Sequence, residues 1–271
     1  MIRWCANCQN YLGEAEPFNK FSISQGLCPK CSESGVAESG DAVERLRPLT
    51  DFYTMLRREA REGINYNPKD WVNKAFELGI KPESMLVGLI QPALYEIGEL
   101  WLTGEVTVFT EHRFSAFAEA LIDVIYQYSP ELDRSRKSKK PDVLIANADA
   151  NYHTLGVKFL EISLLSAGLK THVLLPGLPV SGIIERTKIL KPGILGLSIS
   201  MSSQVKHVTE LSDALAKLPA EERPFLLVGG IPFKQGLTLP PELNVSCCRN
   251  ISDFPLSRVK SRHNGSKETI L

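Results

Sequence analysis

Residues 142–156, DVLIANADANYHTLG, begin with an apolar run and end in a polar turn that contains a histidine. Three similar apolar runs follow, LKTHVLL at 169–175, GILGLSI at 193–199 and PFLLVGG at 224–230. Amphipathic segments of helical length separate the runs, and this alternation predicts an α/β domain with a doubly wound parallel sheet over residues 141–255. Ligands of such sheets bind beyond the carboxyl ends of the strands, so the residues at those ends are candidate binding residues.

Small and polar residues follow these runs at the expected strand ends. The motif NYHTLG occupies residues 151–156 after the first run, SIS ends the third run at 198–200, and Gly229 and Gly230 end the fourth. The GxGxxG fingerprint of dinucleotide sites is absent after the first run, where a histidine occupies the turn. Taken in order, the three strand ends resemble those of the cobalamin-binding domain family, whose motifs are DxHxxG, then SxL or SxT, then GG.

This resemblance implies a cobalamin at the strand ends, with His153 as the lower ligand of cobalt. It implies that Ser198 and Ser200 hydrogen-bond the buried nucleotide tail, and that Gly229 and Gly230 let the tail pass close to the backbone. A neutral imidazole is a suitable cobalt ligand, and glycine avoids the clash that a Cβ would cause. The residues assigned in this way to the cofactor are His153, Asn151, Gly156, Ser198, Ser200, Gly229 and Gly230.

One position departs from the family motif, and another motif extends the resemblance. The family's aspartate two residues before the histidine is Asn151 in this chain. An amide can orient an imidazole by hydrogen bonding, but it cannot accept a proton at neutral pH. Methyl-transfer corrinoid proteins use a carboxylate–histidine pair when the cobalt ligation changes, so Asn151 argues against methyl transfer unless Asp149 substitutes. The LPGLP motif at 175–179 resembles the loop that runs under the corrin edge.

Residues 41–128 carry the apolar periodicity of helices. Spacings of three and four residues indicate amphipathic helices joined by short loops, which predicts an up-down four-helix bundle. Gly79 is a stop signal for the second helix, and Pro92 is expected to kink the third. The predicted helices span residues 43–56, 68–78, 82–101 and 107–128.

The segment ALYEIGELWLTGEVTVFTEHRFSAF, residues 93–117, resembles the helical cap of adenosylcobalamin photoreceptors related to the MerR-type light-responsive repressors. The resemblance implies that Trp101 covers the upper face of the cofactor and that Glu111 and His112 contact its adenosyl group. The alternative is a core tryptophan beside a solvated Glu–His pair. The chain lacks the DNA-binding domain of those repressors, and Leu102 stands where they carry a histidine that captures cobalt.

Together the two resemblances imply a light sensor, not an enzyme, that holds adenosylcobalamin between bundle and sheet. Photolysis of the cobalt–carbon bond is expected to change its conformation or its binding to a regulatory protein or a second copy. The alternative function is a corrinoid methyl carrier for a methyltransferase system. A mutase fragment is disfavoured, because no substrate barrel is present and the chain is too short for one. Some related photoreceptors also bind a bilin, but no attachment point for a bilin is recognisable.

Four of the six cysteines form two CxxC motifs, Cys5 with Cys8 and Cys28 with Cys31, separated by nineteen residues. This layout predicts a tetrahedral four-thiolate zinc site, and hence a zinc-ribbon-like module with its linker over residues 1–40. The alternatives are two redox-active pairs, or cysteines that bind nothing.

Composition limits the remaining functions. The 31 Lys and Arg residues balance 31 Asp and Glu residues, so no net charge favours direct binding to nucleic acid. No apolar run approaches the ~18 residues of a membrane span, and no secretory signal opens the chain, so we expect a cytoplasmic protein without membrane contact. The polar stretch 129–140 is expected to link bundle and sheet, and residues 256–271 to form a loosely ordered tail.

Overall fold

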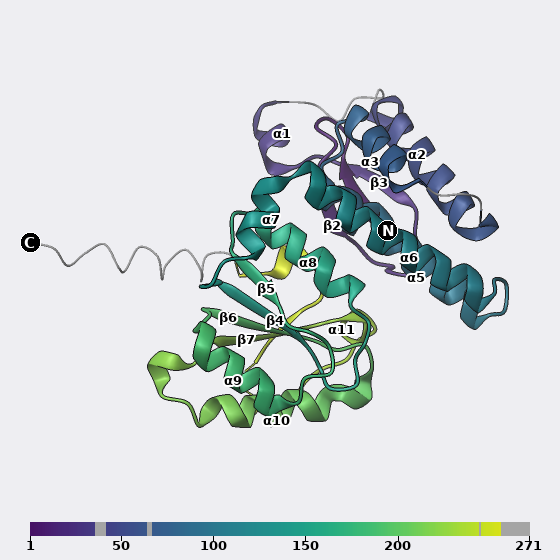
Figure 1. Cartoon of the computed structure of the whole chain (residues 1–271). Helices are drawn as coiled ribbons and strands as arrows, with labels where there is room; N and C mark the ends of the chain where they lie inside the picture. The colour runs from purple at the N-terminus through teal and green to yellow at the C-terminus, as the bar shows by residue number, and fades with distance from the viewer. Residues whose placement is uncertain (36–41, 64–66, 244, 256–271) are drawn as a thin grey trace, which may run out of the picture. The chain divides into compact units, whose positions relative to one another are not determined.

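The computed structural model of this chain describes residues 1–35, 42–63, 67–243 and 245–255. Contacts among the residues divide the chain into two compact units, Met1–Ser129 and Pro130–Leu271. The first unit is mainly helical, and the second contains a parallel sheet (Figure 1). The expected tail at 256–271, and part of the expected linker at 36–41, lie outside the described residues.

The second unit is built on a five-stranded sheet in which every neighbouring pair is parallel. The strands are β4 (Val143–Asn147), β5 (Thr171–Val173), β6 (Ile194–Ser198), β7 (Phe225–Gly229) and β8 (Ser246–Cys248). They lie in the order β5-β4-β6-β7-β8, so the direction of chain progression reverses between β4 and β6. The predicted parallel α/β sheet is therefore confirmed, and β4 and β6 flank the point where such sheets bind ligands.

Helices cover both faces of this sheet, as Figure 1 shows. Alternate residues of β4 point to opposite faces. Leu144 and Ala146 join a core with α9 (Val180–Leu190) and α10 (Val205–Ala216). Val143 and Ile145 join a second core with α8 (Leu155–Ser166). Short helical turns complete the unit, namely η2 (Ser202–Gln204), η3 (Ala220–Glu222), α11 (Ile231–Lys234) and η4 (Ile251–Asp253).

Part of the expected linker at 129–140 is a helix, α7 (Pro130–Arg136), which belongs to the sheet unit. Its Leu132 is buried, and α7 packs with α8 and β5. Asp133 also forms ion pairs with Arg136 and Lys137, three and four residues further along. Burial and local pairing therefore form a helix in a segment whose polar composition predicted a linker.

The helical part of the first unit comprises α2 (Ala42–Glu62), α3 (Pro68–Glu77), α4 (Pro82–Met85), η1 (Leu86–Ile90), α5 (Gln91–Leu102) and α6 (Val108–Tyr128). The side chains of Asn67 and Thr107 cap α3 and α6 by accepting hydrogen bonds from backbone N–H groups. Trp71 of α3 makes edge contacts with Phe52 of α2 and Phe117 of α6. Among the described residues, no helix has both the length and the apolar character needed to cross a membrane.

The third predicted helix contains a π turn, η1, just before Pro92. Within it the Gln91 N–H bonds to the carbonyl of Leu86, five residues earlier. An α-helix would need a hydrogen bond from residue 92 to the carbonyl of Gly88, four residues earlier, and Pro92 has no N–H to donate. The wider π turn lies just before this missing hydrogen bond. The expected kink thus takes the form of a π turn.

A buried carboxylate joins α2 to α5. Glu96 of α5 accepts two hydrogen bonds of 2.5 Å from Arg57 of α2, and Arg61 of α2 binds the same carboxylate. Burial raises the pKa of Glu96, but the hydrogen bonds and charges of Arg57 and Arg61 outweigh that effect and hold the pKa below its usual value. The network therefore stabilises the ionised form of Glu96.

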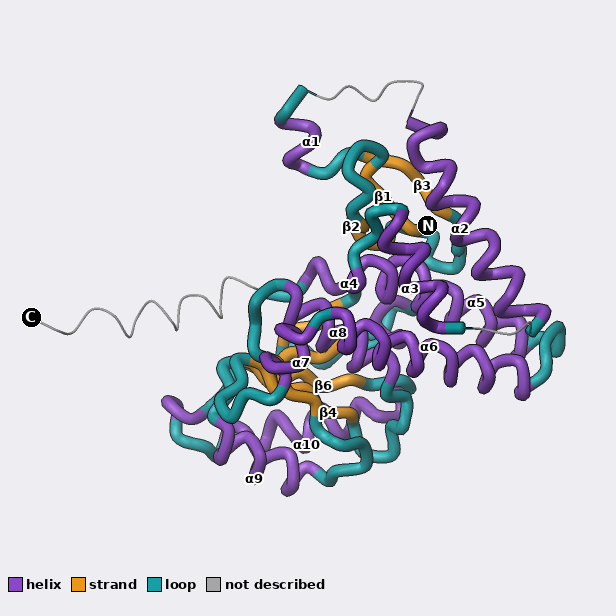
Figure 2. The backbone as a smooth tube through the Cα atoms, turned by 45° about the horizontal axis from the view of Figure 1, so that its top comes forward, coloured by secondary structure: helices purple, strands orange, loops and turns teal. Residues whose placement is uncertain are grey.

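The N-terminal sheet belongs to the first unit, together with the helices described above. It contains β1 (Ile2–Cys5), β2 (Tyr11–Glu14) and β3 (Ile23–Gly26), with β1 in the middle, antiparallel to β2 and parallel to β3. The short helix α1 (Pro29–Glu33) follows it. The view in Figure 2 shows this sheet beside α2, and β3 contacts that helix.

Candidate functional site

The loops after β4 and β6 meet at the carboxyl edge of the parallel sheet. Asn151, 1% exposed, lies in the first loop and makes two hydrogen bonds with its side chain. Its Nδ2 donates to the carbonyl of Ser198 (3.0 Å), and its Oδ1 accepts from the backbone N–H of His153 (3.1 Å). The backbone N–H of Ala148 donates to the same Ser198 carbonyl (2.9 Å). These bonds hold the His153 turn against the end of β6.

The His153 side chain is exposed at this edge. From its sequence position the Asn151 amide is expected to orient the imidazole, but its oxygen accepts from the backbone N–H of His153 instead. Among the residues that the structure describes, none hydrogen-bonds the His153 ring. Asn151 therefore positions the turn that carries the histidine, and the imidazole itself is available to a ligand.

A second buried amide, Gln204 in η2, fixes the loop after β6. Its Oε1 accepts from the backbone N–H groups of Ser200 (2.8 Å) and Met201 (3.2 Å), and the Ser200 hydroxyl lies 3.3 Å from the same oxygen. Its Nε2 donates to the carbonyl of Asp149 in the loop after β4 (3.4 Å). Sequence reasoning missed Gln204 because only the tertiary structure shows that it is buried.

The last residues of three neighbouring strands form a row across the sheet. Asn147 of β4 is in register with Ser198 of β6, and Ser198 is in register with Gly229 of β7. Asn147 is 3% exposed, and neither its Nδ2 nor its Oδ1 has a hydrogen-bond partner among the described residues. An unpaired buried amide costs about 1–3 kcal/mol, so this position favours a polar partner from outside the chain. Sequence reasoning also missed Asn147, because an asparagine at a strand end is not unusual.

The three glycines of the motifs differ in what their missing Cβ allows. Gly230 has a φ of +135°, and a Cβ there would lie 1.8 Å from the carbonyl oxygen of Ile199. A Cβ on Gly229 would lie 3.3 Å from the carbonyl oxygen of Cys248. The position of the Ile199 backbone thus explains why residue 230 is glycine. The expected reason was that glycine makes room for a cofactor. Gly156, in the first turn of α8, has no neighbouring atom within 4 Å of a Cβ position, so the space beside it is open.

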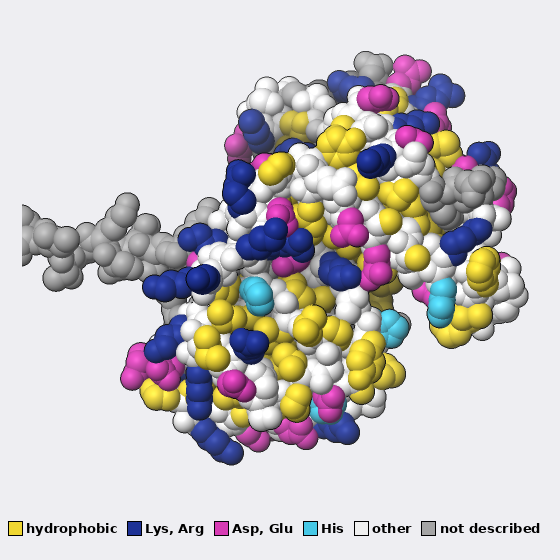
Figure 3. Space-filling view, viewed as in Figure 1, with side chains coloured by type: hydrophobic (Ala, Val, Ile, Leu, Met, Phe, Trp, Pro, Cys, Tyr) yellow, Lys and Arg dark blue, Asp and Glu magenta, His cyan; other side chains and the backbone are white. Residues whose placement is uncertain are grey.

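Exposed apolar side chains surround this edge of the sheet. Tyr152, Leu175 and Met201 follow β4, β5 and β6 and are 70%, 80% and 50% exposed. The ring of Tyr152 also lies about 3.4 Å from the position of a Cβ on Gly177, so the LPGLP loop is next to the histidine turn. Figure 3 shows hydrophobic side chains interrupting the charged surface of the sheet unit. Clustered exposed apolar groups indicate a binding surface.

The helical unit has an exposed apolar surface of its own around the turn between α5 and α6. Trp101 is 45% exposed, so it is not a core residue. Large exposed side chains accompany it, namely Leu102, Val108 and Phe109. In the first turn of α6, the Glu111 carboxylate lies 2.5 Å from Nδ1 of His112 and accepts a 2.7 Å hydrogen bond from the hydroxyl of Ser115. The three residues predicted for the cap therefore lie at the adjoining ends of α5 and α6.

Comparisons with known proteins agree with the strand-end motifs. Residues 54–126 and 141–245 each match a family model described as a B12 binding domain. A trimethylamine corrinoid protein of Methanosarcina barkeri is 26% identical over 189 residues, which cover 69% of this chain and 81% of the relative. Dimethylamine corrinoid protein 1 of Methanosarcina mazei is 23% identical over 184 residues, 66% of this chain and 84% of the relative. The structure of the Methanosarcina barkeri monomethylamine corrinoid protein has the same fold, with a TM-score of 0.60 at 14% identity, covering 79% of this chain and 98% of the other.

These findings confirm one expectation and correct another. The two matched domains confirm that cobalamin is the ligand. The expectation of a light sensor is wrong, because the relatives are corrinoid proteins named for methylamines and are not photoreceptors. The relatives favour the alternative function, a corrinoid methyl carrier.

Proposed function

Because this chain belongs to the cobalamin-binding domain family, we propose that it is a corrinoid methyl-carrier protein that works with separate methyltransferases. In this role the chain is a carrier subunit and not an enzyme. Methyltransferases replace the regulatory protein that was expected as a partner, and methyl replaces adenosyl as the proposed upper ligand. The observation that carries the proposal is the match to a trimethylamine corrinoid protein over 69% of this chain.

The sheet edge fits a corrinoid. An accessible imidazole could ligate the cobalt of a corrinoid, and His153 offers one that is exposed. The nucleotide tail brings polar groups, and Asn147 offers a buried amide without a partner. The macrocycle is broad and partly apolar, and the exposed Tyr152 and Leu175 together with the open space beside Gly156 suit it. When bound, the corrinoid supplies a cobalt centre that accepts a methyl group and gives it up again.

The protein's contribution is to hold one imidazole in a fixed place. The amides of Asn151 and Gln204 join the loops after β4 and β6, so the backbone of His153 is tied to the rigid end of β6. We also propose that the helices of residues 41–128 act as a cap whose Trp101, Glu111 and His112 contact the cofactor. Their exposed apolar surface supports this part of the proposal.

A carrier must hold its cofactor both with and without the methyl group. We therefore expect the full chain to bind methylcobalamin and hydroxocobalamin with dissociation constants within about tenfold of each other, a difference of about 1.4 kcal/mol. Fluorescence quenching titrations with methylcobalamin, hydroxocobalamin and adenosylcobalamin measure this directly. A preference of about a hundredfold or more for the adenosyl form over both others would contradict the methyl-carrier proposal.

The assignment of His153 has a spectroscopic test that does not depend on activity. In protein labelled with [15N]histidine, electron paramagnetic resonance of the bound cobalt(II) corrinoid is expected to show a doublet splitting from the lower axial nitrogen, where unlabelled protein shows a triplet. His153→Ala is expected to lose the label-dependent splitting. His172→Gln, a change in the middle of β5, is the matched control and should keep it. A splitting that stays a triplet after labelling would remove histidine from the axial position.

A further inference from the structure

Four cysteine thiols lie together at one end of the N-terminal sheet. Cys5 ends β1 and Cys8 lies in the turn after it, while Cys28 and Cys31 lie at the start of α1, just after β3. Because β1 and β3 are parallel neighbours, with Cys5 opposite Gly26, the two CxxC turns leave the sheet side by side. The four sulfur atoms all lie within 4.8 Å of one another, and all four cysteines are free.

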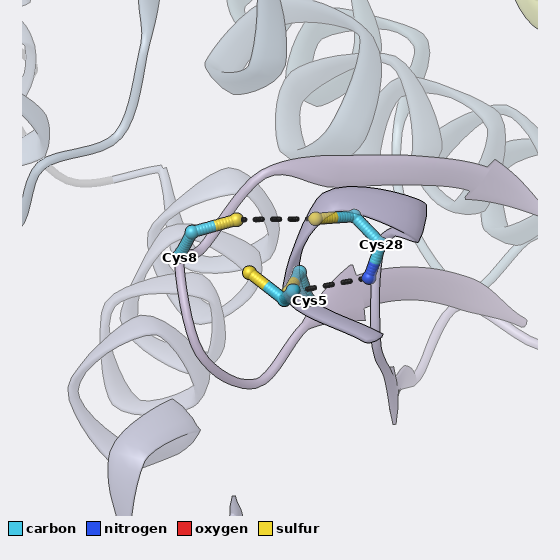
Figure 4. Close-up of side chains that lie close together, drawn as sticks. Cys5, Cys8 and Cys28 are labelled. Carbon is cyan, nitrogen blue, oxygen red and sulfur yellow. Dashed lines mark hydrogen bonds between the residues drawn. The ribbon is translucent and has the colours of Figure 1, made fainter. Parts of the chain in front are cut away.

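The distance between two of these sulfurs fits a shared metal ion. Cys8 Sγ and Cys28 Sγ are 3.7 Å apart, and a dashed line joins them in Figure 4. A disulfide would bring them to about 2.05 Å. Two thiolates bound to one tetrahedral zinc ion, with bonds of about 2.3 Å, lie roughly 3.8 Å apart. The observed separation therefore matches one edge of a zinc–thiolate tetrahedron.

Hydrogen-bond donors point at two of the sulfurs. The backbone N–H of Cys28 donates to Cys5 Sγ at 3.4 Å, the second dashed line in Figure 4. The Nδ2 of Asn7 donates to Cys31 Sγ at 3.3 Å. Such donors stabilise the negative charge of thiolates and are typical surroundings of cysteines that bind a metal. The cluster thus has the four thiols of a metal site, and two of the four sulfurs already accept hydrogen bonds.

Few apolar side chains pack around the cysteines themselves. The buried residues of that cluster are Cys5, Cys28 and Cys31, and only Leu12 and Leu27, both partly exposed, pack against them in the described structure. The rest of the sheet packs against the helical part of the same unit, where Trp4 and Tyr11 lie against Gly88. A bound ion would stabilise the end of the sheet that carries the cysteines.

The same sheet rests on the π turn of the helical part of its unit. A Cβ on Gly88 in η1 would lie 2.7 Å from Cζ2 of Trp4 and 2.8 Å from Cδ2 of Tyr11, so the two rings occupy the space that glycine leaves. Trp4 is fully buried and directly precedes Cys5. An ion that fixes Cys5 therefore also fixes the ring that packs on the turn before α5.

We propose that Cys5, Cys8, Cys28 and Cys31 bind one Zn²⁺, and that this ion holds the N-terminal sheet in the position that orders η1 and α5. The bound ion has a structural role, because four thiolates leave no open position for a substrate. The inference goes beyond the methyl-carrier function and does not depend on it, since neither the four cysteines nor Trp4, Tyr11 and Gly88 are assigned to the corrinoid.

Metal content tests the site. Elemental analysis of the full chain, purified without a corrinoid, is expected to find about one zinc ion per chain. Cys28→Ser should lose it, and Cys247→Ser, a change at an exposed cysteine outside the cluster, should keep it. Wild-type protein reconstituted with Co²⁺ should show the intense visible bands of tetrahedral cobalt–thiolate, which keeps the test valid if Cys28→Ser fails to fold. Wild-type protein without zinc and without these bands, or with two disulfides in place of zinc, would overturn the proposal.

Hydrogen exchange tests the link to the helix. Removal of zinc by a chelator is expected to increase amide exchange in residues 86–102. Gly88→Val should increase exchange in the same segment while zinc stays bound, because the larger side chain displaces Trp4 and Tyr11. Gly98→Ala in α5 is the matched control, since no atom lies within 4 Å of its Cβ position. Unchanged exchange in residues 86–102 after complete zinc loss would overturn the proposed ordering of the helix.

Discussion

Gly230→Ala is expected to lower the free energy of unfolding of the sheet unit by about 4 kcal/mol. A φ of +135° is accessible almost only to glycine, and the strain in alanine costs on the order of 1–3 kcal/mol. The new Cβ would also lie 1.8 Å from the carbonyl oxygen of Ile199, and moving that backbone costs roughly 1–3 kcal/mol more. Urea denaturation of the full chain, followed by circular dichroism, measures the change.

A second glycine in the same unit separates strain from overlap. Gly236 has a φ of +94° but no atom within 4 Å of its Cβ position, so Gly236→Ala adds strain alone and should cost about 1–3 kcal/mol. If Gly230→Ala costs no more than Gly236→Ala, the contact with Ile199 is not the reason for glycine at 230. Because Ile199 directly follows Ser198, the larger shift in Gly230→Ala should weaken corrinoid binding as well.

Glu96→Gln is expected to lower the free energy of unfolding by about 2 kcal/mol near neutral pH. The change removes a buried carboxylate that Arg57 and Arg61 both bind. Breaking a fully buried ion pair costs about 3–5 kcal/mol. The side chains of Arg57 and Arg61 are 32% and 45% exposed, so water can replace part of the lost interaction, which lowers the cost. Thermal or urea unfolding of wild type and variant gives the difference.

The pH dependence of that difference follows from the lowered pKa of Glu96. A carboxyl whose pKa is lower in the folded state contributes stability above its unfolded pKa of about 4.3, and this contribution is lost as pH falls through the folded pKa. The difference between wild type and Glu96→Gln should therefore shrink as the pH falls below about 4.3. Glu99→Gln, an exposed position on the same helix, is the control and should change stability by less than about 0.5 kcal/mol. A constant difference throughout this acid range would contradict the proposed network.

The sequence predicted the sheet because its strands are short, apolar and regularly spaced. It predicted a disruption near Pro92, but the backbone form of that disruption depends on how the wider turn packs against Trp4 and Tyr11. It did not predict α7, whose sequence is mostly polar. That helix is stabilised by the burial of Leu132 and by the ion pairs of Asp133 with Arg136 and Lys137. Neither interaction can be inferred from the amino-acid composition of the segment.

At the candidate site, the motifs located the strand ends but not the contacts. His153 and Ser198 lie at the strand ends where the motifs placed them, while the unpaired amide of Asn147 and the buried amide of Gln204 carried no sequence signal. Asn151 would disfavour methyl transfer only if its side chain faced the imidazole. The structure places that amide on backbone groups, so the identity of the residue says little about the chemistry at the ring.

The two bonds made by Asn151 require an amide. Its nitrogen donates to Ser198 while its oxygen accepts from His153, and an ionised aspartate has no hydrogen to donate to a carbonyl. In the same conformation an aspartic acid would make both bonds only in its protonated form, so acidity would decide whether the loop stays closed on β6. The asparagine amide neither gains nor loses a proton between acidic and neutral pH. The backbone that carries His153 is therefore held in the same position at both pH values.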